Sequence, residues 1–140
     1  MDRRLGALGW IGLASLLGGC GSGVNSSLLS ETGVRECLAN ANIRQQPSSA
    51  ARAGGKGYAP LFAPDFTAYT ADGASINVVV QRSARRASAT AADVRSALRS
   101  FGPSATEAAD RVISAQNVVA VFGRPGSAED RTAVRRCLNR

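Results

Sequence analysis

The sequence contains no histidine and only one lysine, Lys56. The lack of histidine excludes Ser-His-Asp and Cys-His catalytic arrangements, and with them the histidine-based zinc centres. A serine–lysine pair would depend on Lys56, which lies in the glycine-rich segment 53–57. That segment lacks the preceding strand, the spacing and the Ser/Thr of a phosphate-binding loop. We therefore expect a protein that is not an enzyme and that holds no cofactor and no metal.

Carboxylate pairs suited to proton transfer are also scarce. Asp65 and Asp72 are close in sequence, but Asp72 precedes Gly73 in a predicted turn, where its side chain has a structural role. Glu129 and Asp130 lie at the start of a predicted helix, where the helix dipole favours negative charge. We expect all four carboxylates to be structural.

Long apolar runs are missing after the first twenty residues. Residues 5–19 form one uncharged stretch, and it is shorter than the roughly 20 residues that a membrane-spanning helix requires. Arg3 and Arg4 precede this stretch and supply a short basic segment. A basic start followed by a short apolar run is typical of an export signal.

Residues Leu17-Gly18-Gly19-Cys20 end this run and resemble the lipobox of bacterial prolipoproteins: an apolar residue, two small residues, then cysteine. The resemblance covers about the first 21 residues. It implies that Cys20 receives a diacylglyceryl group and that residues 1–19 are removed. It also implies attachment to the outer face of the plasma membrane, or to the outer membrane where the organism has one. The alternative is an ordinary secretory signal followed by an incidental cysteine.

The chain has three cysteines, so setting Cys20 aside leaves Cys37 and Cys137. An even pair in an oxidising compartment favours a disulfide. Each of the two follows Val-Arg-X and precedes leucine, which puts both on the apolar side of predicted helices. We predict a bond between Cys37 and Cys137 that joins the first and last helices. A metal or redox role is disfavoured, because two cysteines without histidine are a poor ligand set and no C-x-x-C is present.

Domain organisation follows from composition and periodicity. We expect a signal peptide over 1–19, a tether over 20–29 and one domain over 30–140 with a flexible loop at about 44–60. The expected elements are a helix over 31–42 capped by Ser30; strands over 66–70 and 75–81 around Asp72-Gly73; a helix over 90–101 opened by Thr90 and Asp93; a helical turn over 104–110; strands over 111–114 and 118–122 around Gln116-Asn117; and a helix over 127–138 opened by Ser127 and Asp130.

This α-ββα-ββα order predicts an α+β fold of two layers. About four antiparallel strands would form the sheet, with the helices on one face. In the helix over 90–101 the inward residues would be Val94, Ala97, Leu98 and Phe101. The other face of the sheet would be open or covered by the 44–60 loop.

Basic residues outnumber acidic ones by seven, and most are arginine. Arg82, Arg85 and Arg86 are candidate anion-binding residues, followed by Arg95 and Arg99 on the next helix. The alternative is a solvated connection. A cluster of aromatics (Tyr58, Phe62, Phe66 and Tyr69) could line a ligand surface, although core packing is favoured.

A lipid-anchored cell-envelope domain is the expected function, serving protein interaction or envelope maintenance. Its partners would be the membrane, through Cys20, and another envelope protein. Export argues against nucleic acid. The alternative is a module that binds a small anionic ligand on the arginines or on the open sheet face.

Overall fold

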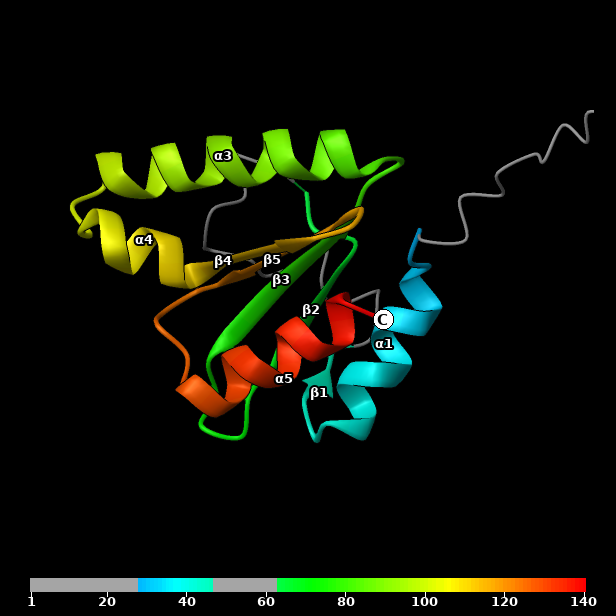
Figure 1. The fold of residues 1–140 in the computed structure, drawn as a ribbon. Coiled ribbons are helices and arrows are strands. Elements are labelled where there is room, and N and C mark those ends of the chain that lie inside the picture. The colour runs from blue at the N-terminus through cyan, green and yellow to red at the C-terminus, as the bar shows by residue number, and fades with distance from the viewer. Residues whose placement is uncertain (1–27, 47–62) are drawn as a thin grey trace, which may run out of the picture.

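The computed structural model describes residues 28–46 and 63–140 (Figure 1). In chain order the elements are α1 (Glu31–Asn40), β1 (Arg44–Gln45), β2 (Phe66–Tyr69), β3 (Ser75–Val80), α3 (Ala84–Ser100), α4 (Ala105–Arg111), β4 (Val112–Ala115), β5 (Val118–Phe122) and α5 (Ala128–Leu138). The predictions for the signal peptide, Cys20 and most of the 44–60 loop lie outside the described residues.

The strands form one antiparallel sheet in the order β1-β2-β3-β5-β4. The predicted α+β class is confirmed, with five strands instead of four. The additional strand is β1, in which Arg44 pairs with Tyr69 and Gln45 with Ala68. We predict a loop that begins at about residue 44, and this boundary is wrong because residues 44 and 45 form a strand. Two polar residues carry no strand periodicity, so only their pairing with β2 reveals the strand.

Helices cover both faces of the sheet, so the prediction of two layers with helices on one face is wrong. In Figure 1, α3 and α4 lie above the sheet, and α1 and α5 lie below it. Ile76, Val78 and Phe122 pack with the α1 and α5 side, whereas Val79 and Val121 pack with α3 and α4. All five residues of β5 are buried. An unbroken apolar strand of this kind requires a cover on each face.

Helix α3 begins six residues earlier than predicted. Its N-cap is Ser83, whose hydroxyl accepts a hydrogen bond from the backbone N–H of Arg86 at 3.2 Å. Thr90 is not a cap: its hydroxyl accepts from the Gln81 side chain at 3.2 Å. The buried positions of the helix are Ala87, Ala91, Val94 and Leu98. This stripe leaves Phe101 outside the core, 72% exposed, contrary to the prediction.

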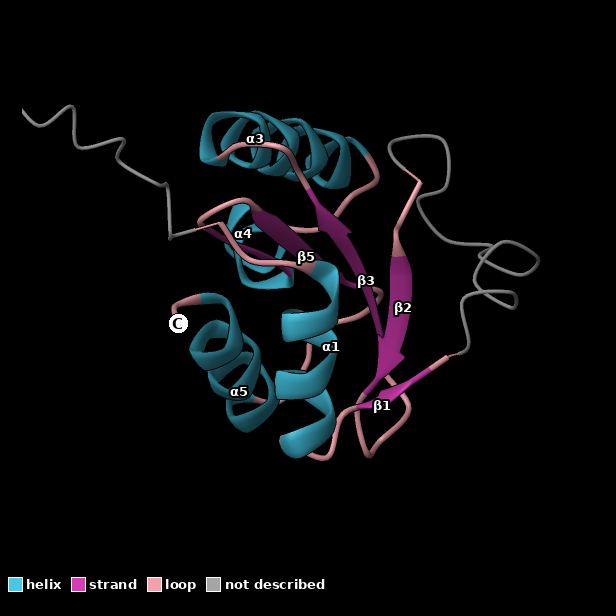
Figure 2. Cartoon of the chain, turned by 90° about the vertical axis from the view of Figure 1, so that its right-hand side faces the viewer, coloured by secondary structure: helices cyan, strands magenta, loops and turns pink. Residues whose placement is uncertain are grey.

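Helices α1 and α5 begin at the predicted caps. Ser30 accepts from the N–H of Gly33, and Ser127 accepts from the N–H of Asp130. The two helices lie side by side on one face of the sheet (Figure 2). A disulfide joins Cys37 to Cys137 across a Cα–Cα distance of 5.6 Å, which confirms the predicted bond.

Candidate functional site

Three segments of the chain meet at one end of the sheet around the side chain of Asn117, and we call this the Asn117 end. The Asn117 amide oxygen accepts from the N–H of Leu29 at 2.7 Å. Its amide nitrogen donates to the carbonyls of Leu29 at 3.0 Å and of Gln81 at 2.9 Å. The residues before α1 are thereby held against the end of β3 and the start of β5.

The position of Asn117 follows from the turn between β4 and β5. Gln116 occupies the left-handed region with φ of 51°, and Asn117 turns inward and is 2% exposed. Its backbone carbonyl also accepts from the N–H of Gln81 at 2.6 Å. The sequence identified 116–117 only as a turn, because the partners of Asn117 are 88 and 36 residues away.

The three candidate anion-binding arginines follow directly from this junction. Arg82 is next to Gln81, and Arg85 and Arg86 lie in the first turn of α3. All three side chains are exposed. Among the described residues, none of the three guanidinium groups has a hydrogen-bond or ion-pair partner. We call Arg82, Arg85 and Arg86 the arginine patch.

Arg95 and Arg99 do not extend the patch. The guanidinium of Arg95 donates to the backbone carbonyl of Val112 at 3.2 Å, so it lies against the sheet edge at β4. Arg99 lies in the last turn of α3. From Arg86 to Arg99 the helix rises about 20 Å, which separates Arg99 from the patch.

No nearby acid in the sequence compensates the patch, since no Asp or Glu occurs between Asp72 and Asp93. Asp65 also lies towards this end, and its carboxylate accepts from the N–H of Val80 at 2.6 Å. The first turn of α3 contains no acidic residue, unlike the first turns of α1 and α5. Cations at a helix N-terminus oppose the helix dipole. Folding of α3 therefore does not account for the arginines at its start.

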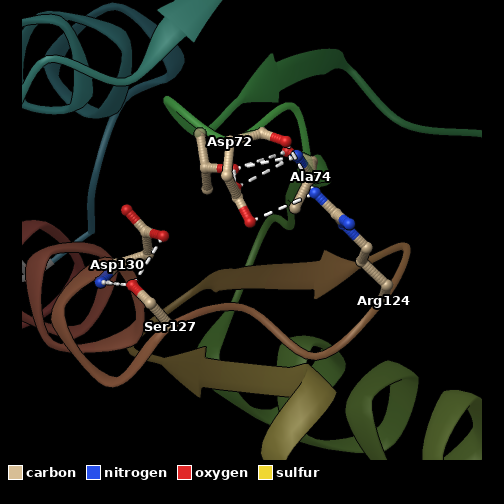
Figure 3. A network of polar contacts seen from close by, with 6 residues as sticks. Asp72, Ala74, Arg124, Ser127 and Asp130 are labelled. Carbon is tan, nitrogen blue, oxygen red and sulfur yellow. Dashed lines mark hydrogen bonds and ion pairs between the residues drawn. The ribbon is translucent and has the colours of Figure 1, made fainter.

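At the opposite end of the sheet, the β2–β3 turn is organised by Asp72, and we call this the Asp72 end (Figure 3). The Thr70 hydroxyl donates to the Asp72 carboxylate, and the N–H of Ala74 approaches the same oxygen at 3.4 Å. Arg124 pairs with the other carboxylate oxygen at 3.1 Å. These contacts, the Thr70 bond first, lower the pKa of Asp72 from its ordinary value of 3.8.

Three of the four carboxylates considered from sequence, Asp65, Asp72 and Asp130, make structural contacts. Asp65 precedes β2 and Asp72 follows it, so the two lie at opposite ends of one strand. Asp130 accepts from the hydroxyl of Ser127 at 2.7 Å within the cap of α5 (Figure 3). None of these contacts brings two carboxylates together for acid–base chemistry.

A buried arginine near the Asp72 end was not identified from the sequence. Arg111 is 6% exposed and is the last residue of α4, whereas we predicted the first residue of a strand. Its Nε donates to the carbonyl of Phe122 at 3.0 Å, and a terminal nitrogen donates to that of Gly123 at 2.6 Å. Arg111 thus secures the end of β5 from the neighbouring helix.

A shallow hollow of about 710 Å³ lies beside α1 and β1. It is lined by Arg35, Glu36, Ala39, Asn42, Ile43, Arg44, Gln45 and Ala71. The polar groups at its floor already bind one another: the amide of Gln45 donates to the carbonyl of Arg35, and the Arg35 guanidinium lies 4.1 Å above the ring of Phe66. These contacts fix β1 to α1.

The proposed aromatic ligand surface is not formed by its described members. Phe66 is fully buried in the core, and the hydroxyl of Tyr69 donates to the side chain of Gln46 at 3.2 Å. Tyr58 and Phe62 lie outside the described residues.

In the part of the chain that the structure describes, no group of three His, Cys, Asp or Glu side chains could hold a metal ion. None of the helices in 28–46 and 63–140 has the length and apolar character needed to cross a membrane. No family model, curated protein or solved structure matches the chain.

Proposed function

We propose that the chain is an exported domain held at a membrane by lipid on Cys20, and that it acts in the cell envelope by binding rather than by catalysis. The observation that carries this proposal is the use of the three cysteines. One is the last residue of a lipobox-like sequence, and the other two form the Cys37–Cys137 disulfide. Disulfides persist in oxidising compartments and are rare in the cytosol.

The binding role is supported by what the described side chains do. The carboxylates and the buried arginine form turns, caps and strand ends. Among the described residues, the exposed guanidiniums of Arg82, Arg85 and Arg86 at the Asn117 end have no protein partner. Another envelope protein is the partner that we propose for the domain as a whole.

A test of the anchor compares the full chain with Cys20→Ser after expression in bacteria. The expected wild-type mass is that of residues 20–140 plus acyl chains, with the protein in the membrane fraction. Cys20→Ser should lose the lipid and remain as a precursor or a soluble form. The double variant Cys37→Ser, Cys137→Ser is the control, because it removes the other thiols and should keep the lipid. A wild-type mass without lipid would overturn the proposal.

Crosslinking in intact membranes tests the partner. The lipidated chain should recover the same neighbouring protein in repeated experiments. Recovery of that protein should be lost with Cys20→Ser, which removes the domain from the membrane. Failure to recover any reproducible neighbour would contradict a protein-interaction role.

The second candidate function is binding of a small anionic ligand, and the unpartnered guanidiniums of the patch favour it. Inorganic phosphate is a suitable first probe. If this function is correct, phosphate should raise the unfolding temperature of the chain. Replacing Arg82, Arg85 and Arg86 with glutamine should abolish that rise.

A further inference from the structure

We infer that the arginine patch rests on the anionic lipid headgroups of the membrane that holds the anchor. This inference depends on the proposed lipid on Cys20 and adds a surface, an orientation and a partner to it. The argument uses the place where the chain joins the domain, the reach of the tether and the charge of the patch.

The patch lies where the chain joins the domain. Leu29 is bound to Asn117, and Asn117 is bound to Gln81, the residue immediately before Arg82. Figure 2 looks onto this side of the molecule, where α1 and α3 both begin. The two features are 53 residues apart in sequence, from Leu29 to Arg82, and the Asn117 contacts bring them together.

The reach of the tether is comparable to the size of the domain. Eight peptide units separate Cys20 from Leu28, and they span at most about 29 Å when fully extended. Helix α3 alone, with its 17 residues, is about 25 Å long. Because the chain enters the domain at the Asn117 end, the anchor approaches from the side that carries the patch, and attraction between the patch and the headgroups would hold this end towards the lipid surface.

The charge of this end matches an anionic surface. The patch carries three guanidiniums within five residues, and charges within about 8–10 Å of headgroups interact with them at physiological ionic strength. Each arginine near an anionic leaflet favours the apposed orientation about fivefold, so three give roughly a hundredfold. No described carboxylate forms an ion pair with the patch, and Asp65 accepts a hydrogen bond from the backbone of Val80.

A broad anionic surface fits these arginines better than a small ligand does. Small-molecule sites are concave and enclose most of their ligand. The arginines are exposed at the start of a helix, and the shallow hollow beside α1 and β1 lies away from them, next to Ala71. Three mobile, solvated side chains can contact several headgroups at once.

Hydrogen exchange of the full lipidated chain tests the inference. The chain is reconstituted into vesicles of phosphatidylcholine alone or of phosphatidylcholine with phosphatidylglycerol. Residues 82–90 should exchange more slowly in the anionic vesicles, and high salt should reverse the effect. Residues 70–74 and 123–127 at the Asp72 end should exchange equally in both. Equal exchange of residues 82–90 in both vesicles would overturn the inference.

Two charge-matched triple variants complete the test. Replacement of Arg82, Arg85 and Arg86 with glutamine should remove the protection by anionic vesicles. Replacement of Arg44, Arg99 and Arg124 with glutamine lowers the net charge equally, away from the Asn117 end, and should preserve it. Loss of protection in both variants would show a general charge effect and would contradict the assigned surface.

The remaining outcomes separate this inference from the proposed function. An intact mass without lipid on Cys20 would overturn both. If the chain carries lipid but residues 82–90 exchange at the same rate with and without phosphatidylglycerol, only the membrane-facing surface is overturned. Protection of residues 82–90 by inorganic phosphate in detergent, without vesicles, would overturn the membrane-facing surface and would support binding of a small anion instead.

Discussion

At the scale of single residues, Asn117 not only forms the turn between β4 and β5 but also binds the backbone of two other segments. One amide satisfies both backbone groups of Leu29 and the carbonyl of Gln81. Asn117→Ala should lower the free energy of unfolding by about 1–3 kcal/mol, because these groups lose their partners. Urea denaturation measures the change.

Asn117→Asp is the informative companion variant. A carboxylate can still accept from Leu29, but it cannot donate to the two carbonyls. We therefore expect Asn117→Asp to be destabilised as well. A wild-type unfolding midpoint in either variant would show that the junction is held by other contacts.

Asp72 provides a prediction on pH. Its pKa is lowered in the folded state, chiefly by the Thr70 hydroxyl. The stabilisation is therefore present above the ordinary value of 3.8 and is lost as the pH falls through the lowered folded pKa. Asp72→Asn should be less stable than wild type above that value, and the difference should disappear in stronger acid. Unfolding curves across this range check it; a difference independent of pH would contradict it.

At the scale of elements, α3 combines a well-formed cap with an unfavourable first turn. Replacing both Arg85 and Arg86 with glutamate should raise the free energy of unfolding by about 1–2 kcal/mol at low ionic strength, because acids complement the helix dipole there. Thermal unfolding at low and high salt measures this. Arg99→Glu, at the other end of the same helix, should have the opposite sign. Equal effects at both ends would exclude the dipole as the cause.

The same helix shows how far sequence reasoning reached. Caps with an acid in the first turn, such as Ser30 and Ser127, were located correctly. Ser83 was missed because the residue three positions after it is Arg86 and not an acid. Thr90, which is followed three positions later by Asp93, matched the capping-box pattern better. The placement of α3 on the face of the sheet opposite to α1 and α5 depends on its packing against β4 and β5.

For the candidate site, the sequence named the arginines and the disulfide but not the geometry that relates them. Cys37 and Cys137 were paired because they are the two cysteines left once Cys20 is set aside, and because both lie on the apolar side of predicted helices. The contacts of Asn117 and Arg111 are tertiary, formed with backbone groups distant in sequence, and no local pattern encodes such partners. Two-residue β1 was missed for the same reason, since its register exists only against β2.

At the scale of the whole molecule, the Cys37–Cys137 bond closes a loop of 100 residues. In the double variant Cys37→Ala, Cys137→Ala, the free energy of unfolding should fall by about 2–5 kcal/mol. Urea unfolding of the variant and of the reduced wild type should agree, because both lack the same constraint. Agreement between the variant and the oxidised wild type would mean that the bond adds nothing to stability.

The position of the bond also sets how the domain would bear tension. If the proposed lipid anchor on Cys20 were pulled away from the domain, the hydrogen bonds between Leu29 and Asn117 would carry the first load. Once they parted, only the segment up to residue 36 could peel away before the force reached Cys37. From there the sulfur–sulfur bond would pass it to α5 directly. For a load held at residues 138–140, the sheet, which lies in the loop that this bond closes, would be bypassed.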